Sequence, residues 1–232
     1  LNRRRGKPVR QMSACCDRIH MLPQPFARRC TLTSTAAVSG GVYAPETSPI
    51  PQGALATMRD NAFRAAMRSS FRCARELAFG LHIPWRADPV AVSVSNPLLY
   101  IRGAVARGLL LPSTLIEVWD RVSARDAGPL AACKKAFALA GTQGPPHAGR
   151  TVGGAVLNLC SDPLERLRRL GLNSLRALEY ARLAARRSEF APLADGVDEW
   201  ATTRTMRQNR RPEHQRAALR VVQDAGAVPQ TV

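Results

Sequence analysis

The chain has few aromatic residues, few lysines and no long apolar run. Phe, Trp and Tyr together make up 5% of its 232 residues. Such a composition argues against a sheet-rich fold and against a protein that binds single-stranded nucleic acid by stacking bases on aromatic rings. No apolar run approaches the roughly 20 residues that a membrane-spanning helix needs. We therefore expect no transmembrane segment.

Patterns typical of metal sites and active sites are also missing from the sequence. None of the six cysteines forms a Cys-x-x-Cys pair, and no histidine lies at metal-ligand spacing from them. The four histidines stand apart from any partner at catalytic spacing, and neither Gly-x-x-x-x-Gly-Lys nor Gly-x-Gly-x-x-Gly occurs. We expect a protein that is not an enzyme, with no metal, no cofactor and free thiols in a reducing compartment.

What the chain has in abundance is arginine. It contains 31 arginines, three lysines and 17 acidic residues, for a formal net charge of +17. An excess of this size repels itself unless an anionic partner neutralises it. Arginine is also the cation whose planar fork fits phosphate. The composition therefore predicts a protein that lies against RNA.

The first 52 residues are predicted to form an extended basic arm. Residues 1–45 contain seven arginines and one lysine but a single acid, Asp17. The prolines at 23, 25, 45, 49 and 51 are expected to break any helix, and the pair Gly40-Gly41 is expected to add a flexible joint. A basic, hydroxyl-rich and acid-poor segment is typical of a mitochondrial transit peptide. The alternative is a retained arm that threads into a ribonucleoprotein.

A helix is predicted from about residue 53 to residue 79, ending at Gly80. Apolar side chains recur along it at helical spacing; they are Leu55, Phe63, Met67, Phe71, Ala74 and Leu77. Four arginines fall on one line beside this apolar stripe, and they are Arg64, Arg68, Arg72 and Arg75. The row is interpreted as a track for a phosphate backbone, the alternative being a solvated helix face.

The remaining sequence predicts further helices grouped into units. The predicted units are a helical domain over 53–141, a loop over 142–154, a helical hairpin over 155–200, and a basic C-terminal helix with its tail over 201–232. In the first unit, Asn96 with Pro97 is predicted to begin a helix that ends near Gly108, and Thr114 with Glu117 is predicted to begin the next. Pro129 is predicted to begin another that ends at Gly141. The C-terminal unit supplies a second set of candidate RNA contacts, namely Arg204, Arg207, Arg210 and Arg211.

One short motif points to a different chemistry. The run Leu170-Gly171-Leu172-Asn173-Ser174-Leu175-Arg176-Ala177-Leu178-Glu179 resembles the attachment site of acyl and peptidyl carrier proteins. The resemblance implies that Ser174 begins a helix and carries phosphopantetheine. Asn173 stands where that family usually has aspartate, and arginines surround the motif in place of an acidic face. In the alternative interpretation, Gly171 ends one helix and Ser174 caps the next.

These observations predict an all-α fold, an irregular array of helical hairpins between the basic arm and the basic C-terminal helix. The predicted function is that of a non-catalytic, RNA-contacting subunit of an organellar ribonucleoprotein, with the mitochondrial ribosome as first choice and rRNA and neighbouring subunits as partners. The alternative is a peripheral accessory subunit of a mitochondrial inner-membrane respiratory complex. A carrier-like domain is the third hypothesis. The predicted location is the mitochondrial matrix or the matrix side of the inner membrane.

Overall fold

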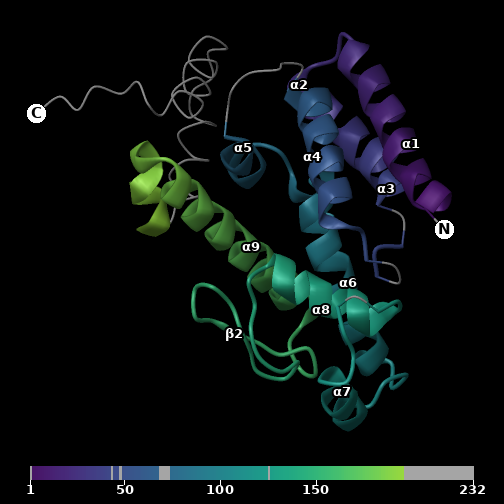
Figure 1. The fold of residues 1–232 in the computed structure, drawn as a ribbon, viewed down its shortest axis with the longest axis vertical. Helices are drawn as coiled ribbons and strands as arrows, with labels where there is room; N and C mark the ends of the chain where they lie inside the picture. The colour runs from purple at the N-terminus through teal and green to yellow at the C-terminus, as the bar shows by residue number, and fades with distance from the viewer. Residues whose placement is uncertain (1, 43, 47–48, 68–73, 125, 196–232) are drawn as a thin grey trace, which may run out of the picture.

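A computed structural model of the chain describes residues 2–42, 44–46, 49–67, 74–124 and 126–195 (Figure 1). Within these ranges the elements are, in chain order, α1 (Asn2–Met21), α2 (Phe26–Leu32), the π-helix η1 (Thr33–Val38), α3 (Ser39–Gly41), α4 (Gln52–Met67), α5 (Arg75–Leu81), the 3₁₀-helix η2 (Trp85–Ala87), α6 (Pro89–Ala106), α7 (Pro112–Trp119), α8 (Pro129–Leu139), β1 (Gly149–Arg150), β2 (Val156–Leu157), α9 (Leu164–Arg186) and the 3₁₀-helix η3 (Ser188–Asp195).

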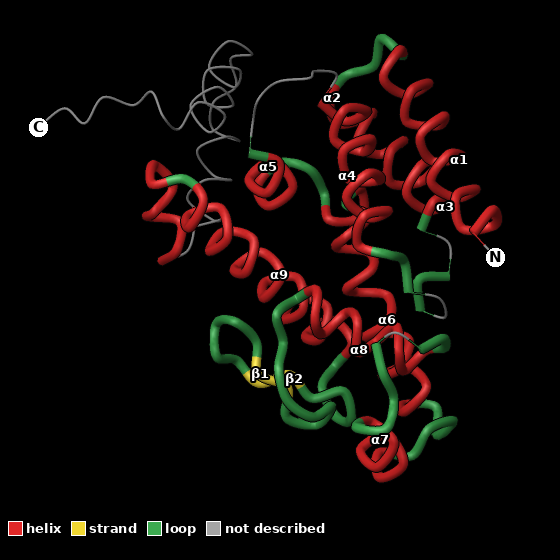
Figure 2. The backbone as a smooth tube through the Cα atoms, in the orientation of Figure 1, coloured by secondary structure: helices red, strands yellow, loops and turns green. Residues whose placement is uncertain are grey.

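The prediction of a mostly helical protein is confirmed. In the described part of the chain the strands are β1 and β2, which form one antiparallel pair with Gly149 opposite Leu157. Figure 2 shows this pair as a short yellow segment in an otherwise helical molecule. None of the described helices combines the length and the apolar character that crossing a bilayer would require.

The predicted extended arm is wrong, because α1, α2, η1 and α3 are helical. The first three pack against α4, and α3 packs against α1 and η1. Met12, Cys16 and Ile19 lie at helical spacing on α1 and are buried in an apolar cluster that includes side chains of α4. The prolines at 23, 25, 45, 49 and 51 stand between helices, where they mark ends, and Pro8 lies inside α1, so the prolines do not prevent helix formation. Gly41 is no flexible joint: a Cβ there would lie 2.7 Å from Met12 Cβ, so glycine permits the close approach of α3 to α1.

The predicted continuous helix over 53–79 is two helices, α4 and α5. Ala74 precedes α5 with φ −66° and ψ 107°, an extended conformation that no helix can include. The apolar stripe itself is largely as predicted, since Leu55, Phe63 and Leu77 are buried. Phe71 lies outside the described residues.

The helix predicted to begin at Asn96 begins at Pro89. Asp88 caps it by accepting a hydrogen bond from the Val90 backbone N–H at 2.9 Å, and Pro97 lies inside the helix. Both Asp88-Pro89 and Asn96-Pro97 fit the local pattern for a helix start, and only the first is used. The predicted ends near Gly108 and Gly141 are confirmed, because both glycines follow a helix with positive φ.

Three apolar clusters hold the helices together. The first joins α1, α2, η1 and α4, and the second joins α6, α7 and α8 to the N-terminal half of α9. In the second, the Trp119 ring meets Phe137 edge-on at 5.0 Å. The third is small and contains Leu77 of α5, Tyr180 and Leu183 of α9, and Phe190 of η3. Helix α9 therefore links the second cluster to the third.

Candidate anion-binding cleft

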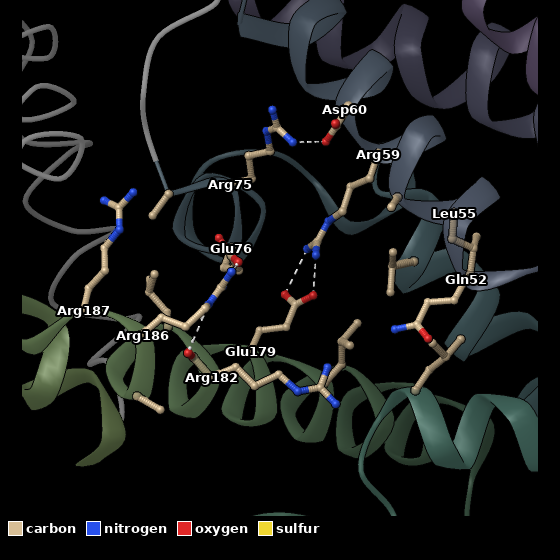
Figure 3. A pocket seen from close by; sticks show the side chains of 17 residues that line it. Gln52, Leu55, Arg59, Asp60, Arg75, Glu76, Glu179, Arg182, Arg186 and Arg187 are labelled. Atoms are coloured by element: carbon tan, nitrogen blue, oxygen red, sulfur yellow. Dashed lines mark hydrogen bonds and ion pairs between the residues drawn. The ribbon is translucent and has the colours of Figure 1, made fainter.

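A cleft of about 1030 Å³ lies between α4, α5 and α9, with the C-terminal end of α8 contributing to its wall. Its lining combines aliphatic side chains with charged ones (Figure 3). The aliphatic residues include Leu55, Val90, Leu139, Leu175 and Leu183. The charged residues are Arg59, Asp60, Arg75, Glu76, Glu179, Arg182, Arg186 and Arg187.

Arg59 forms the centre of a buried ionic network. Its Nη2 donates to Asp88 Oδ2 at 2.7 Å and to Glu179 Oε2 at 2.9 Å, while Nη1 donates to the other oxygen of Glu179. The guanidinium also lies over the Phe79 ring, 4.7 Å from its centroid. Because the Arg59 side chain is only 12% exposed, these contacts substitute for water.

Burial and pairing act in opposite directions on the ionisation of this network. Burial disfavours the charged guanidinium of Arg59, but Asp88 and Glu179 outweigh that effect and raise its pKa above the ordinary value. For the Glu179 carboxyl, burial prevails over pairing with Arg59 and raises its pKa. Arg59 therefore stays charged at any physiological pH, and its two partners connect α4 to the start of α6 and to α9.

At the rim of the cleft, arginines pair with the remaining carboxylates. Arg75 donates to Asp60, and Arg186 of α9 donates to Glu76 of α5. Burial acts to raise the pKa of Glu76, but hydrogen bonds from its own backbone N–H and from Arg186 outweigh it and lower the pKa. Each carboxylate in the cleft is thus already in an ion pair.

Two arginines remain at the rim. Among the described residues, neither Arg182 nor Arg187 pairs with a carboxylate; both are exposed, and Arg187 lies over the Phe190 ring at 5.9 Å. Since the cleft carboxylates are engaged by other arginines, these two guanidiniums give the rim an excess of positive charge. A cleft of this kind favours anions, and arginine favours phosphate among them.

The predicted arginine row does not form as one line in the structure. Arg64 lies on α4, where it donates to Asn61, and Arg75 lies on the separate helix α5 in its pair with Asp60. Their two intermediate members, Arg68 and Arg72, lie outside the described residues. So do the predicted C-terminal contacts Arg204, Arg207, Arg210 and Arg211.

Ser174 is not the start of a helix, which corrects the carrier-like interpretation. It lies inside the 23-residue helix α9 and is 2% exposed. Its hydroxyl donates to the Ala140 carbonyl oxygen at 2.7 Å and accepts from the Val152 N–H at 3.0 Å. Gly171 also lies inside α9, where a Cβ would come within 2.8 Å of Leu98 Cδ1. The glycine serves helix packing, and the serine is inaccessible to a modifying enzyme.

Three of the described cysteines are buried in the protein interior. Cys16, Cys30 and Cys133 are buried, and burial raises the pKa of Cys16 to about 12 and that of Cys30 to about 11. A thiol that stays protonated at neutral pH is a poor nucleophile and a poor metal ligand. In the described ranges, no three side chains of His, Cys, Asp or Glu gather closely enough to hold a metal ion.

Comparison of the chain with protein-family models, with curated proteins and with solved structures finds no match. The cleft is therefore interpreted from its own geometry.

The sequence analysis did not single out Arg59, Asp88 or Glu179, although one signal was available. Glu179 is the only acidic residue between Arg166 and Arg187, a stretch that holds several arginines. An isolated acid in such a setting indicates a specific partner. Nothing local identifies that partner, since Arg59 lies 120 positions away.

Proposed function

We propose that this protein is a non-catalytic component of a ribonucleoprotein, and that it contacts RNA phosphates at the rim of the cleft between α4, α5 and α9. The observation that supports this most directly is the pair Arg182 and Arg187. Both guanidiniums are exposed at one end of α9, and the carboxylates around them are engaged by other arginines.

The residue types in the cleft favour phosphate over other anions. A guanidinium can donate two parallel hydrogen bonds to one phosphate, and it keeps its charge throughout the physiological pH range. The scarcity of aromatic residues leaves little means of stacking bases. We therefore expect contacts that neutralise phosphates and show little sequence preference.

The assembly we propose is organellar, with the mitochondrial ribosome as first choice; this part of the proposal rests on composition. Packing of α1 and α2 against α4 favours the retained-segment hypothesis over the cleaved one. Removing Met12, Cys16 and Ile19 would expose the apolar side chains that they cover. Co-sedimentation with ribosomal particles at moderate salt tests the assembly.

The cleft is tested by a pair of double variants that remove the same charge. Arg182→Gln with Arg187→Gln removes both rim guanidiniums. Arg107→Gln with Arg150→Gln is the control, because these arginines are also exposed and have no carboxylate partner in the described part of the chain. Binding of single-stranded RNA is measured over a range of salt concentrations. If the rim contacts two phosphates, the magnitude of the slope of log K against log salt decreases by about 1.4 in the rim variant, since each phosphate contact on a single strand contributes about 0.7.

Three outcomes are informative. A loss of RNA affinity confined to the rim variant supports the cleft as the RNA-binding site. Equal losses in both variants mean that RNA binds through net charge and that the cleft is not the site. An affinity that does not respond to salt contradicts RNA contact altogether, because phosphate neutralisation releases counterions.

A further inference from the structure

The turn between α1 and α2 exposes apolar side chains between two exposed arginines. Residues 21–27 carry no charged side chain. Within them Met21 is 75% exposed, Leu22 40% and Phe26 37%. The exposed cations Arg18 and Arg28 stand on either side. This turn has an apolar tip and a cationic collar, and we name it the α1–α2 tip.

The α1–α2 tip is held in place from behind. Arg29 is buried, and it donates from Nε to the Ala66 carbonyl oxygen at 3.0 Å and from Nη1 to the Gln24 carbonyl oxygen. His20 Nδ1 lies 3.1 Å from the Arg64 carbonyl oxygen. The neighbouring residues Ile19 and Cys30 are in the first apolar cluster. The exposed side chains are therefore presented by a folded scaffold.

The position and charge of the tip decide which partner it suits. Figure 1 shows the turn at the end of the α1–α2 pair, where the chain reverses direction. Asp17 is the acid nearest to it in sequence, and the arginines at 18, 28 and 29 keep the net charge of residues 17–29 positive. Apolar side chains that enter a bilayer interface beside cations that stay at phosphate level are the two features of a peripheral lipid contact.

We propose that the α1–α2 tip inserts into the interface of an anionic lipid bilayer. Met21, Leu22 and Phe26 enter the boundary between headgroups and acyl chains, and Arg18 and Arg28 lie among the lipid phosphates. This surface is separate from the rim arginines on α9, so the inference does not depend on the proposed RNA contact.

The test is sedimentation of the full chain with vesicles of phosphatidylcholine, with and without about one third phosphatidylglycerol. The variant M21S/L22S/F26S removes the apolar tip without changing charge. The control L109S/L111S changes two leucines that are exposed at the turn between α6 and α7. We expect the tip variant to lower partitioning into anionic vesicles by about tenfold or more, and the control to leave it unchanged. Unfolding curves are recorded for both variants to show that each is folded under the assay conditions, because Leu22 and Phe26 are only 40% and 37% exposed and bury the rest of their surface.

A chain with a net charge of +17 also adsorbs to anionic vesicles through charge alone, so each measurement is repeated at high salt. Binding that high salt abolishes equally in the wild type and the tip variant overturns the proposal. Equal loss in the tip variant and the control also overturns it. So does self-association that is lost in the tip variant while vesicle binding persists, because the tip would then be a protein interface.

The collar is tested separately with Arg18→Gln and Arg28→Gln together. At high salt, where adsorption through the net charge is suppressed, this variant should lose most of the preference for anionic over neutral vesicles and keep the residual binding to neutral ones. A preference that survives the loss of both arginines would show that the collar plays no part, and would overturn the assignment of Arg18 and Arg28.

Discussion

Arg59 inside the cleft and Arg182 at its rim are the same residue type in contrasting environments. Arg59 is largely buried, bridges Asp88 and Glu179, and lies over an aromatic ring. Arg182 is exposed and, among the described residues, pairs with no carboxylate. A buried arginine must have its charge compensated inside the protein, whereas an exposed one is compensated by water and remains available to an anion. The number of arginines in the chain therefore does not reveal which of them can bind a partner.

The largest effect is expected from removing the buried member of this pair. Arg59→Ala leaves Asp88 and Glu179 without the cation that compensates them, and breaking a buried ion pair in this way costs about 3–5 kcal/mol. We expect urea unfolding at neutral pH to show that loss. Arg182→Ala is the matched control. Similar losses of unfolding free energy in the two variants would show that the buried Arg59 contributes no more to stability than the exposed Arg182.

The next largest effect on stability is expected at a buried position of α9, compared with an exposed position beside it. Ser174→Ala leaves the Val152 N–H and the Ala140 carbonyl oxygen without their shared partner, at a cost of about 1–3 kcal/mol. Asn173→Ala changes the exposed neighbour and should be close to neutral. Thermal unfolding measures both. Stability that falls with Asn173→Ala and not with Ser174→Ala would contradict the burial of Ser174.

The pH dependence of stability should have opposite signs for Glu76 and Glu179, the two glutamates of the cleft. The pKa of Glu76 is lowered in the folded state, so its contribution is present above the unfolded value near 4.5 and is lost as the pH falls below it. The pKa of Glu179 is raised, so its contribution is present below 4.5 and is lost as the pH rises through the folded-state value.

This difference is measured with Glu76→Gln and Glu179→Gln. Unfolding free energies are recorded for each variant and the wild type from acidic to neutral pH. With rising pH, the wild type should gain stability relative to Glu76→Gln and lose stability relative to Glu179→Gln. Slopes of the same sign would show that one carboxyl has been assigned the wrong environment.

The smallest effect on stability is expected at the rim. Arg182→Gln with Arg187→Gln should change the unfolding free energy by about 0.5 kcal/mol or less, because neither side chain has a carboxylate partner in the described part of the chain. Its effect should instead appear in RNA affinity. A large loss of stability in this double variant would mean that the two arginines serve the fold.

Local signals account for what could be predicted of the fold. Pro129 and Gly141 bound one helix in both the sequence and the structure, since proline at a helix start and glycine after its end act within a few residues. The N-terminal helices were missed because prolines were interpreted as preventing helix, whereas most of them separate helices and Pro8 is accommodated inside α1. Gly41 and Gly171 were misread for a related reason, because their role depends on Met12 and Leu98, which lie on other helices.

The helical class, the charge excess and the shortage of aromatic rings follow from the amino-acid sequence without the fold, because composition and periodicity are properties of the chain whatever its neighbours are. Which arginines pair with carboxylates inside the protein and which stay exposed to solvent depends on the tertiary structure. Arg59 meets Asp88 and Glu179 across 29 and 120 positions of sequence, and Coulomb energy depends on the distance through space between two charges. The difference between a structural arginine and a candidate contact for RNA therefore arises only when α4, α5 and α9 are brought together.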